Sequence, residues 1–150
     1  MENIVYRNIP QVTLQFRDEQ LKLKIKVYSS IDIFNLVLPF FNECMQHHEE
    51  INVLYLNNVN KVLGIHCVGV GSDTATPVNT KAILQGAILS NATSIVLIHN
   101  HPSGSLSPSR EDDNCTDCIK KAAKLFNVSL LDHLIITDES YYSYSDEGRI

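Results

Sequence analysis

No apolar run in this sequence approaches the roughly 20 residues that a helix needs to cross a bilayer. The first ten residues carry charges and lack the apolar core of a secretory signal peptide. Internal repeats, linkers and low-complexity segments are also missing. These absences predict a cytoplasmic protein without a membrane segment, in which the four cysteines remain reduced.

A basic patch, which nucleic-acid-binding proteins commonly carry, is missing too. The formal net charge is −5 at pH 7, and only Lys22, Lys24 and Lys26 gather on one side of a predicted strand. Because contacts to phosphate depend on lysine and arginine, this charge argues against strong nonspecific binding to DNA at physiological salt.

The composition, with 44% hydrophobic and 19% charged residues and few glycines and prolines, is that of a globular protein. A chain of 150 residues fits one domain and buries about two thirds of its unfolded surface, so it needs no disulfides. We expect residues 1–45 to form a β-hairpin and a helix that pack as part of one domain with residues 46–150.

Hydrophobic periodicity predicts strands and helices that alternate in the middle of the chain. Apolar and polar residues alternate over 12–16 and 21–27, which predicts the hairpin. Apolar residues then recur at helical spacing from Ile31 to Phe41, and Pro39 is expected to kink or divide that helix. Further strands are predicted over residues 51–56, 62–68, 94–98, 130–137 and 141–145. Further helices are predicted to begin at Asn79 or Thr80 and at Ser109, the second running to about Phe126.

Two histidines and a carboxylate follow the 94–98 strand, whose continuous apolar character is typical of a central strand. His99 and His101 point to one face of an extended chain, about 6.6 Å apart at Cα. Asp112 lies in the first turn of the next helix, which the intervening loop can bring back over the strand end. Two imidazoles and one carboxylate fill three tetrahedral positions on Zn²⁺ and leave one open, the pattern of a catalytic zinc site.

Two further residues are candidates for catalytic roles beside this metal. Glu49 precedes the 51–56 strand and could carry a proton from water to a leaving amine, with Glu50 as the alternative. Ser109 could donate a hydrogen bond to the oxyanion of a tetrahedral intermediate. Ser109 and Asp112 also match a helix capping box, but one geometry cannot serve both purposes fully, so we expect Asp112 to ligate rather than cap.

The run from His99 to Asp112, HNHPSGSLSPSRED, resembles the signature of the RadC family, a bacterial branch of the JAMM metalloprotease superfamily. Residues 91–98, 130–137 and 141–148 are similar to RadC segments as well, so the resemblance covers residues 45 to 150. It implies an α/β fold, a cytidine-deaminase-like three-layer α/β/α sandwich with a mixed sheet.

The resemblance also implies an activity and a role for each candidate residue. The JAMM pattern assigns zinc to His99, His101 and Asp112, proton transfer to Glu49 and oxyanion stabilisation to Ser109. The implied reaction is hydrolysis of an amide bond in a peptide or isopeptide substrate. The alternative is a DNA-repair-associated binding module with little or no catalysis. RadC proteins usually carry a helix-hairpin-helix-like region, whereas the first 45 residues here predict a β-hairpin and a helix.

Other chemistry-bearing residues receive a structural interpretation. A nucleobase deaminase shares the fold but needs His-x-Glu and Pro-Cys-x-x-Cys, and Asn114 stands before Cys115 here. Cys115 and Cys118 are expected to lie buried on one helix face. Cys44 with His47 or His48 has nothing nearby to complete a metal site. His133 could be hydrogen bonded in the core or support a metal ligand, and Asp132 could orient a ligand.

Overall fold

The computed structural model describes residues 25–71 and 78–150. The hairpin predicted over residues 12–27 lies outside these residues except for its last three. Within them, Lys26 forms an isolated antiparallel bridge with Lys61. No helix in the described part of the chain combines the length and apolarity that a membrane span requires.

Within the described residues, five strands form one mixed sheet in the order β2-β1-β3-β4-β5. The strands are β1 (Glu50–Leu56), β2 (Val62–Val70), β3 (Ser94–Asn100), β4 (Ser129–Ile136) and β5 (Tyr141–Ser143). β3 and β4 are parallel, and the other three pairs are antiparallel. All five were predicted from the sequence, with bounds that differ by up to two residues.

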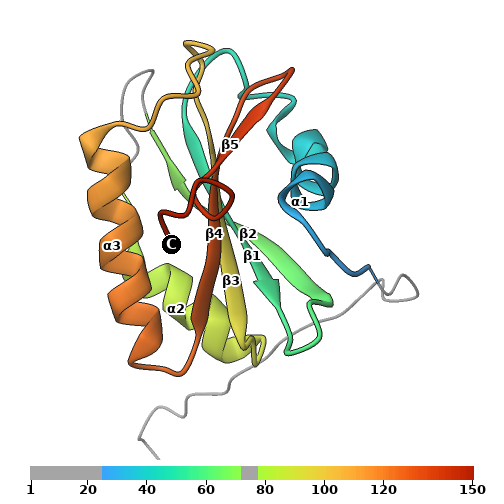
Figure 1. The fold of residues 1–150 in the computed structure, drawn as a ribbon, viewed down its shortest axis with the longest axis vertical. Coiled ribbons are helices and arrows are strands. Elements are labelled where there is room, and N and C mark those ends of the chain that lie inside the picture. The colour runs from blue at the N-terminus through green and yellow to red at the C-terminus, as the bar shows by residue number, and fades with distance from the viewer. Residues whose placement is uncertain (1–24, 72–77) are drawn as a thin grey trace, which may run out of the picture.

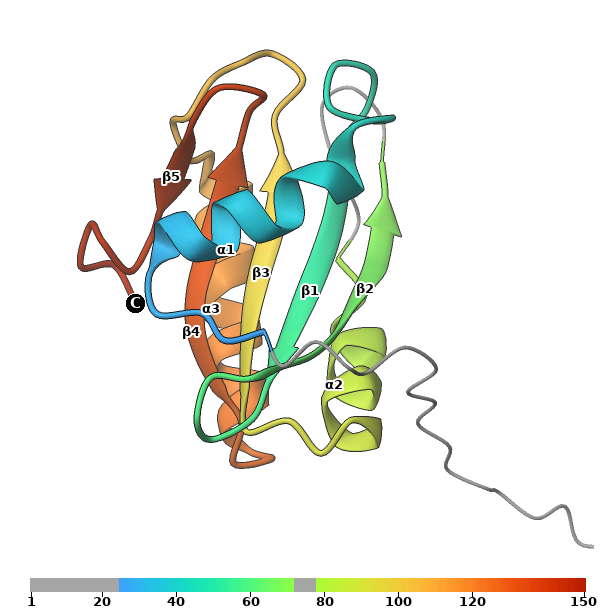
Figure 2. The same cartoon turned by 90° about the vertical axis from the view of Figure 1, so that its right-hand side faces the viewer.

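Helices cover both faces of the sheet, which confirms the predicted three-layer α/β/α sandwich (Figures 1 and 2). The helices are α1 (Ser30–Val37), the short 3₁₀ helix η2 (Leu38–Phe41), α2 (Thr80–Leu89) and α3 (Arg110–Lys124). α1 and η2 pack on one face, and α2 and α3 on the other. Pro39 lies in η2, directly after α1 ends, so the predicted division of that helix is confirmed.

β3 runs through the centre of the sheet, and all seven of its residues are buried. Its side chains alternate between the two cores, since Val96 and Ile98 pack with α1 whereas Ile95 and Leu97 pack with α2 and α3. The prediction of a strand covered on both faces is therefore confirmed. The same alternation directs the side chains at the end of β3 to opposite faces of the sheet.

The buried face of α3 differs from the predicted one. Its buried residues are Thr116, Ile119 and Ala123, whereas Cys118 is exposed, so the prediction that Cys118 packs in the core was wrong. Phe126 is half exposed because the helix ends at Lys124. Serine caps the start of this helix, and acidic residues follow in the first turn, where they favour the positive end of the helix dipole.

Candidate metal centre

His99, the second-last residue of β3, and His101, just beyond the strand, converge at one point. Their Nε2 atoms are 2.9 Å apart. The loop after them leads back to the first turn of α3, where Asp112 Oδ1 lies 3.2 Å from His99 Nε2 and Oδ2 lies 3.6 Å from His101 Nε2. The three side chains thus offer ligand atoms that all lie within 4.8 Å of one another.

The two oxygens of Asp112 have separate surroundings. Oδ2 accepts hydrogen bonds from the backbone N–H and the hydroxyl of Ser109, both at 2.7 Å, and completes a capping box. Oδ1 faces His99 instead. The expectation that Asp112 would not cap the helix was wrong, because Oδ2 completes the capping box. The carboxylate still faces the histidines, with Oδ1 toward His99 and Oδ2 3.6 Å from His101 Nε2.

A chain of hydrogen bonds fixes the tautomer of His99. Thr116 donates its hydroxyl proton to the carbonyl oxygen of Asp112 at 2.7 Å, so it must accept from His133 Nδ1, also at 2.7 Å. His133 Nε2 is then an acceptor, and His99 Nδ1, 2.8 Å away, donates to it. His99 consequently presents the lone pair of Nε2 to the point where the three side chains meet.

His101 reaches the same state by a different contact. Its Nδ1 donates to the backbone carbonyl of Ser105 at 2.7 Å, which leaves the Nε2 lone pair facing His99 and Asp112. Two nitrogen lone pairs and a carboxylate therefore share one small volume. The two lone pairs and the carboxylate repel one another unless a cation or a proton lies between them. Together they fit a divalent cation such as Zn²⁺.

Electrostatics favour a positive charge beside Asp112, which a proton on His101 or a bound cation supplies. Burial alone would raise the pKa of Asp112, but hydrogen bonds from His101 and His99 hold that pKa far below its ordinary value. Burial opposes protonation of His101, yet hydrogen bonds to Asp112 and Ser105 raise its pKa. Complete burial, followed by the charge of His99, lowers the pKa of His133 well below its ordinary value, so this ring stays neutral.

The convergent side chains line a pocket of about 660 Å³, which also contains Ser109 and Glu49. Glu49 lies directly before β1, and its charge contributes to the raised pKa of His101. Glu50, the next residue, turns to the other face of the sheet, where Oε1 lies 3.0 Å from His48 Nε2. Strand alternation thus brings Glu49, and not its alternative Glu50, into the pocket with the histidines.

A comparison with known protein families identifies the chain. The sequence model of the RadC-like JAB domain matches residues 27–149. The chain belongs to the RadC-like JAB domain family. This confirms the resemblance seen in the sequence. The match begins at residue 27, ahead of α1, and therefore extends further toward the N-terminus than the resemblance did.

Relatives of this JAB domain occur in bacteria and archaea. The UPF0758 protein of Flavobacterium johnsoniae is 42% identical over 134 residues, which are 89% of this chain and 57% of that protein. The UPF0758 protein of Streptococcus gordonii is 46% identical over 99 residues, 66% of this chain and 44% of that protein. That of Methanosarcina mazei is 38% identical over 127 residues, 85% of this chain and 55% of that protein. The chain spans about half the length of the curated relatives it matches.

Sequence reasoning identified some supporting residues of this JAB domain and missed others. His133 is buried and hydrogen bonded, as expected. Thr116 was missed, because a threonine at helical spacing gives no sign of which histidine it will meet. Asp132 does not orient a ligand, since it accepts hydrogen bonds from the Ser143 hydroxyl and from the backbone of Ser145 and His133.

Cys115 is the cysteine that lies near the candidate metal ligands. It lines the same pocket as Asp112 and is half-buried. Burial first, and then the charge of Asp112, raise the pKa of its thiol to about 12. The thiol is therefore protonated at neutral pH and acts as a small apolar side chain in the pocket wall.

Proposed function

We propose that this RadC-like JAB domain is a zinc-dependent hydrolase of metallopeptidase or isopeptidase type, which cleaves an amide bond. The observation that carries the proposal is the convergence of two imidazole lone pairs and one carboxylate on a single point beside an open pocket. His99, His101 and Asp112 would hold the ion. Three protein ligands leave one position for water, as in catalytic zinc sites.

The chain's own residues have defined tasks in this reaction. Zinc held by these residues would supply hydroxide at neutral pH, since zinc lowers the pKa of a bound water to about 7. Glu49 takes the proton of the attacking water and passes it to the leaving amine. Ser109 donates its hydroxyl to the developing oxyanion, for which that hydroxyl must turn from Asp112 Oδ2, its present acceptor.

The alternative, a DNA-repair-associated binding module, has less support. The formal net charge of −5 disfavours contacts to phosphate. The partner we propose is therefore a peptide or isopeptide substrate, bound in the pocket that contains Glu49 and Ser109.

Glu49→Gln tests this mechanism. We expect the variant to bind zinc as the wild type does but to hydrolyse amide bonds about 10²–10⁴-fold more slowly, because the proton carrier is gone. The measurement compares zinc content with release of new amines from a library of peptides and lysine-linked isopeptides. Glu43→Gln, at an exposed carboxylate before β1, is the matched control and should retain the wild-type rate.

Two results of that experiment would contradict the proposal. If zinc-loaded wild type releases no amine from any member of the library, the hydrolase assignment is wrong. If Glu49→Gln hydrolyses as fast as the wild type, then Glu49 is not the proton carrier.

Thr116→Val tests the hydrogen-bond chain behind His99. Valine keeps the shape of threonine but leaves His133 Nδ1 without its acceptor, so the His99 tautomer is no longer fixed. We expect the affinity for zinc at this site to fall by about 10–100-fold. Thr116→Ser, which retains the hydroxyl, should bind zinc within a few-fold of the wild type. Competition with a chelating dye measures both, and equal affinities of the two variants would disprove the role of the chain.

A further inference from the structure

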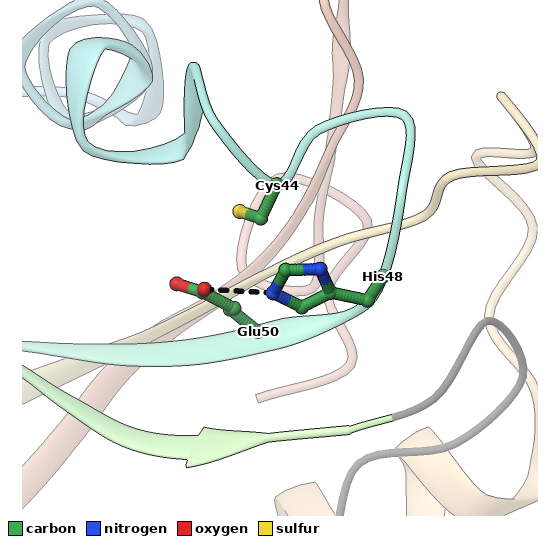
Figure 3. Close-up of side chains that lie close together, drawn as sticks. All are labelled: Cys44, His48 and Glu50. Atoms are coloured by element: carbon green, nitrogen blue, oxygen red, sulfur yellow. Dashed lines mark hydrogen bonds and ion pairs between the residues drawn. The ribbon is translucent and has the colours of Figure 1, made fainter.

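A second group of metal-ligating side chains lies at the same end of the sheet, on the face that α1 covers. Figure 3 shows Cys44, His48 and Glu50 directed toward one another. Their ligand atoms all lie within 4.8 Å of one another, and His48 Nε2 is 3.0 Å from Glu50 Oε1. The expectation that nothing completes a set around Cys44 was therefore wrong. Cys67 lies beside this group of three but outside it, with its Sγ 3.8 Å from Glu50 Oε2.

The four side chains come from three parts of the local structure. Cys44 and His48 belong to the segment between η2 and β1, Glu50 opens β1, and Cys67 lies on the paired strand β2. The segment before β1 is held by Asn100, whose amide donates to the carbonyl oxygens of Cys44, Met45 and His48. Backbone contacts, together with the hydrogen bond between His48 and Glu50, therefore set the positions of the metal-ligating side chains.

We propose that Cys44, His48, Glu50 and Cys67 bind a zinc-class divalent cation, at a site separate from the one that contains His99. Two sulfurs, one imidazole nitrogen and one carboxylate oxygen suit a borderline-soft ion. Ligand atoms of a tetrahedral zinc ion lie roughly 3.3–3.8 Å from one another. The His48–Glu50 and Cys67–Glu50 separations, 3.0 Å and 3.8 Å, are close to this range. The Cys67 side chain must still turn toward Cys44 and His48 to complete the set, since it lies outside the group of three.

The surroundings of the two thiols disfavour a reactive cysteine. Burial first, and then the charge of Glu50, raise the pKa of Cys44 to about 12, and the same two causes raise the pKa of Cys67. A thiol next to a carboxylate forms its nucleophilic thiolate poorly. A bound cation reverses this effect, because it attracts the carboxylate and both thiolates at once.

The cluster is also accessible to an ion. Cys44 is buried at 2% exposure, but the His48 and Glu50 side chains retain 33% and 21%. An ion that binds from solvent would displace the thiol protons and the hydrogen bond between His48 and Glu50. It would then tie the segment that precedes β1 to β2.

Cobalt(II) substitution tests the site in the full chain. None of the three proposed ligands of the first site is a sulfur, so a near-ultraviolet thiolate-to-cobalt charge-transfer band that survives disruption of those ligands reports the second site. We expect this band in the wild type and in the His101→Ala/Asp112→Asn double variant, which lacks two ligands of the first site. We further expect about two zinc ions per chain in the wild type and about one in the double variant.

Variants of the second site complete the experiment. Cys44→Ser should lose the band and one zinc ion, whereas Cys118→Ser, at an exposed cysteine outside the cluster, should lose neither. Because Cys44 is buried and serine there could disturb folding, His48→Gln and Glu50→Gln serve as second variants and should each weaken cobalt binding. Circular dichroism confirms that each variant is folded.

The opposite results would overturn the proposal. If the double variant has neither bound zinc nor a charge-transfer band, there is no second site. A band that survives Cys44→Ser, or one that disappears with Cys115→Ser, assigns the sulfur elsewhere. Loss of amide hydrolysis with the band intact would contradict only the hydrolase proposal, so the two outcomes are distinguishable.

Discussion

His99→Ala is expected to abolish zinc binding at the first site. The variant removes the ligand whose tautomer is fixed through His133, and it leaves only His101 and Asp112, too few for a tetrahedral ion. In a Cys44→Ser background, where the second site is disabled, bound zinc should fall from about one ion per chain to none. Amide hydrolysis should fall with it to the background rate, because the activated water is lost.

The control for this experiment is His66→Ala. His66 is an exposed histidine on β2, so its loss should leave zinc content and hydrolysis unchanged. Elemental analysis of the dialysed proteins gives the metal content directly. An unchanged zinc content in His99→Ala would show that the convergent side chains do not hold the ion.

Asn100→Ala is expected to be the most destabilising single substitution around the two sites. Asn100 is fully buried, accepts a hydrogen bond from the Glu50 N–H at 2.8 Å and donates to three carbonyl oxygens at 2.9–3.3 Å. Each buried polar group left without a partner costs about 1–3 kcal/mol, so the free energy of unfolding should fall by at least about 3 kcal/mol. Urea denaturation measures the change.

Asn52 provides a matched control on the neighbouring strand. It is also buried, but its amide nitrogen has no hydrogen-bond partner among the described residues. Asn52→Leu should therefore be close to neutral or stabilising, because an apolar side chain avoids that desolvation penalty. Similar losses of stability in Asn100→Ala and Asn52→Leu would show that the four bonds of Asn100 carry no special weight.

The convergence of His99, His101 and Asp112 was predictable because its geometry is local. An extended chain places residues two apart on one face, and a capped helix start fixes where its first-turn carboxylate lies. His99 and His101 therefore follow from the end of a strand, and Asp112 from the start of a helix. The central position of β3 was predictable for a related reason, since continuous and alternating apolar patterns distinguish central from peripheral strands. The mixed sheet followed from the family resemblance.

The second cluster was not predictable in the same way. Cys67 comes beside Glu50 only through the pairing of β1 with β2, and that pairing contains register shifts between Ile51 and Asn52 and between Tyr55 and Leu56. Sequence spacing does not report such irregularities. Cys118 was wrongly placed in the core because cysteine suits both a core and a partly exposed position, while Thr116 enters the core to meet His133.

Glu49 and Glu50 are neighbours in the chain, yet their carboxylates serve opposite sides of the sheet. Deleting or inserting one residue just ahead of Ile51 would exchange these sides, because each added residue reverses the direction of the next side chain. The length of the connection between η2 and β1 therefore constrains which site each glutamate faces as strongly as the sequence of that connection does. Evolutionary or engineered changes in this connection should be tolerated in steps of two residues more readily than in steps of one.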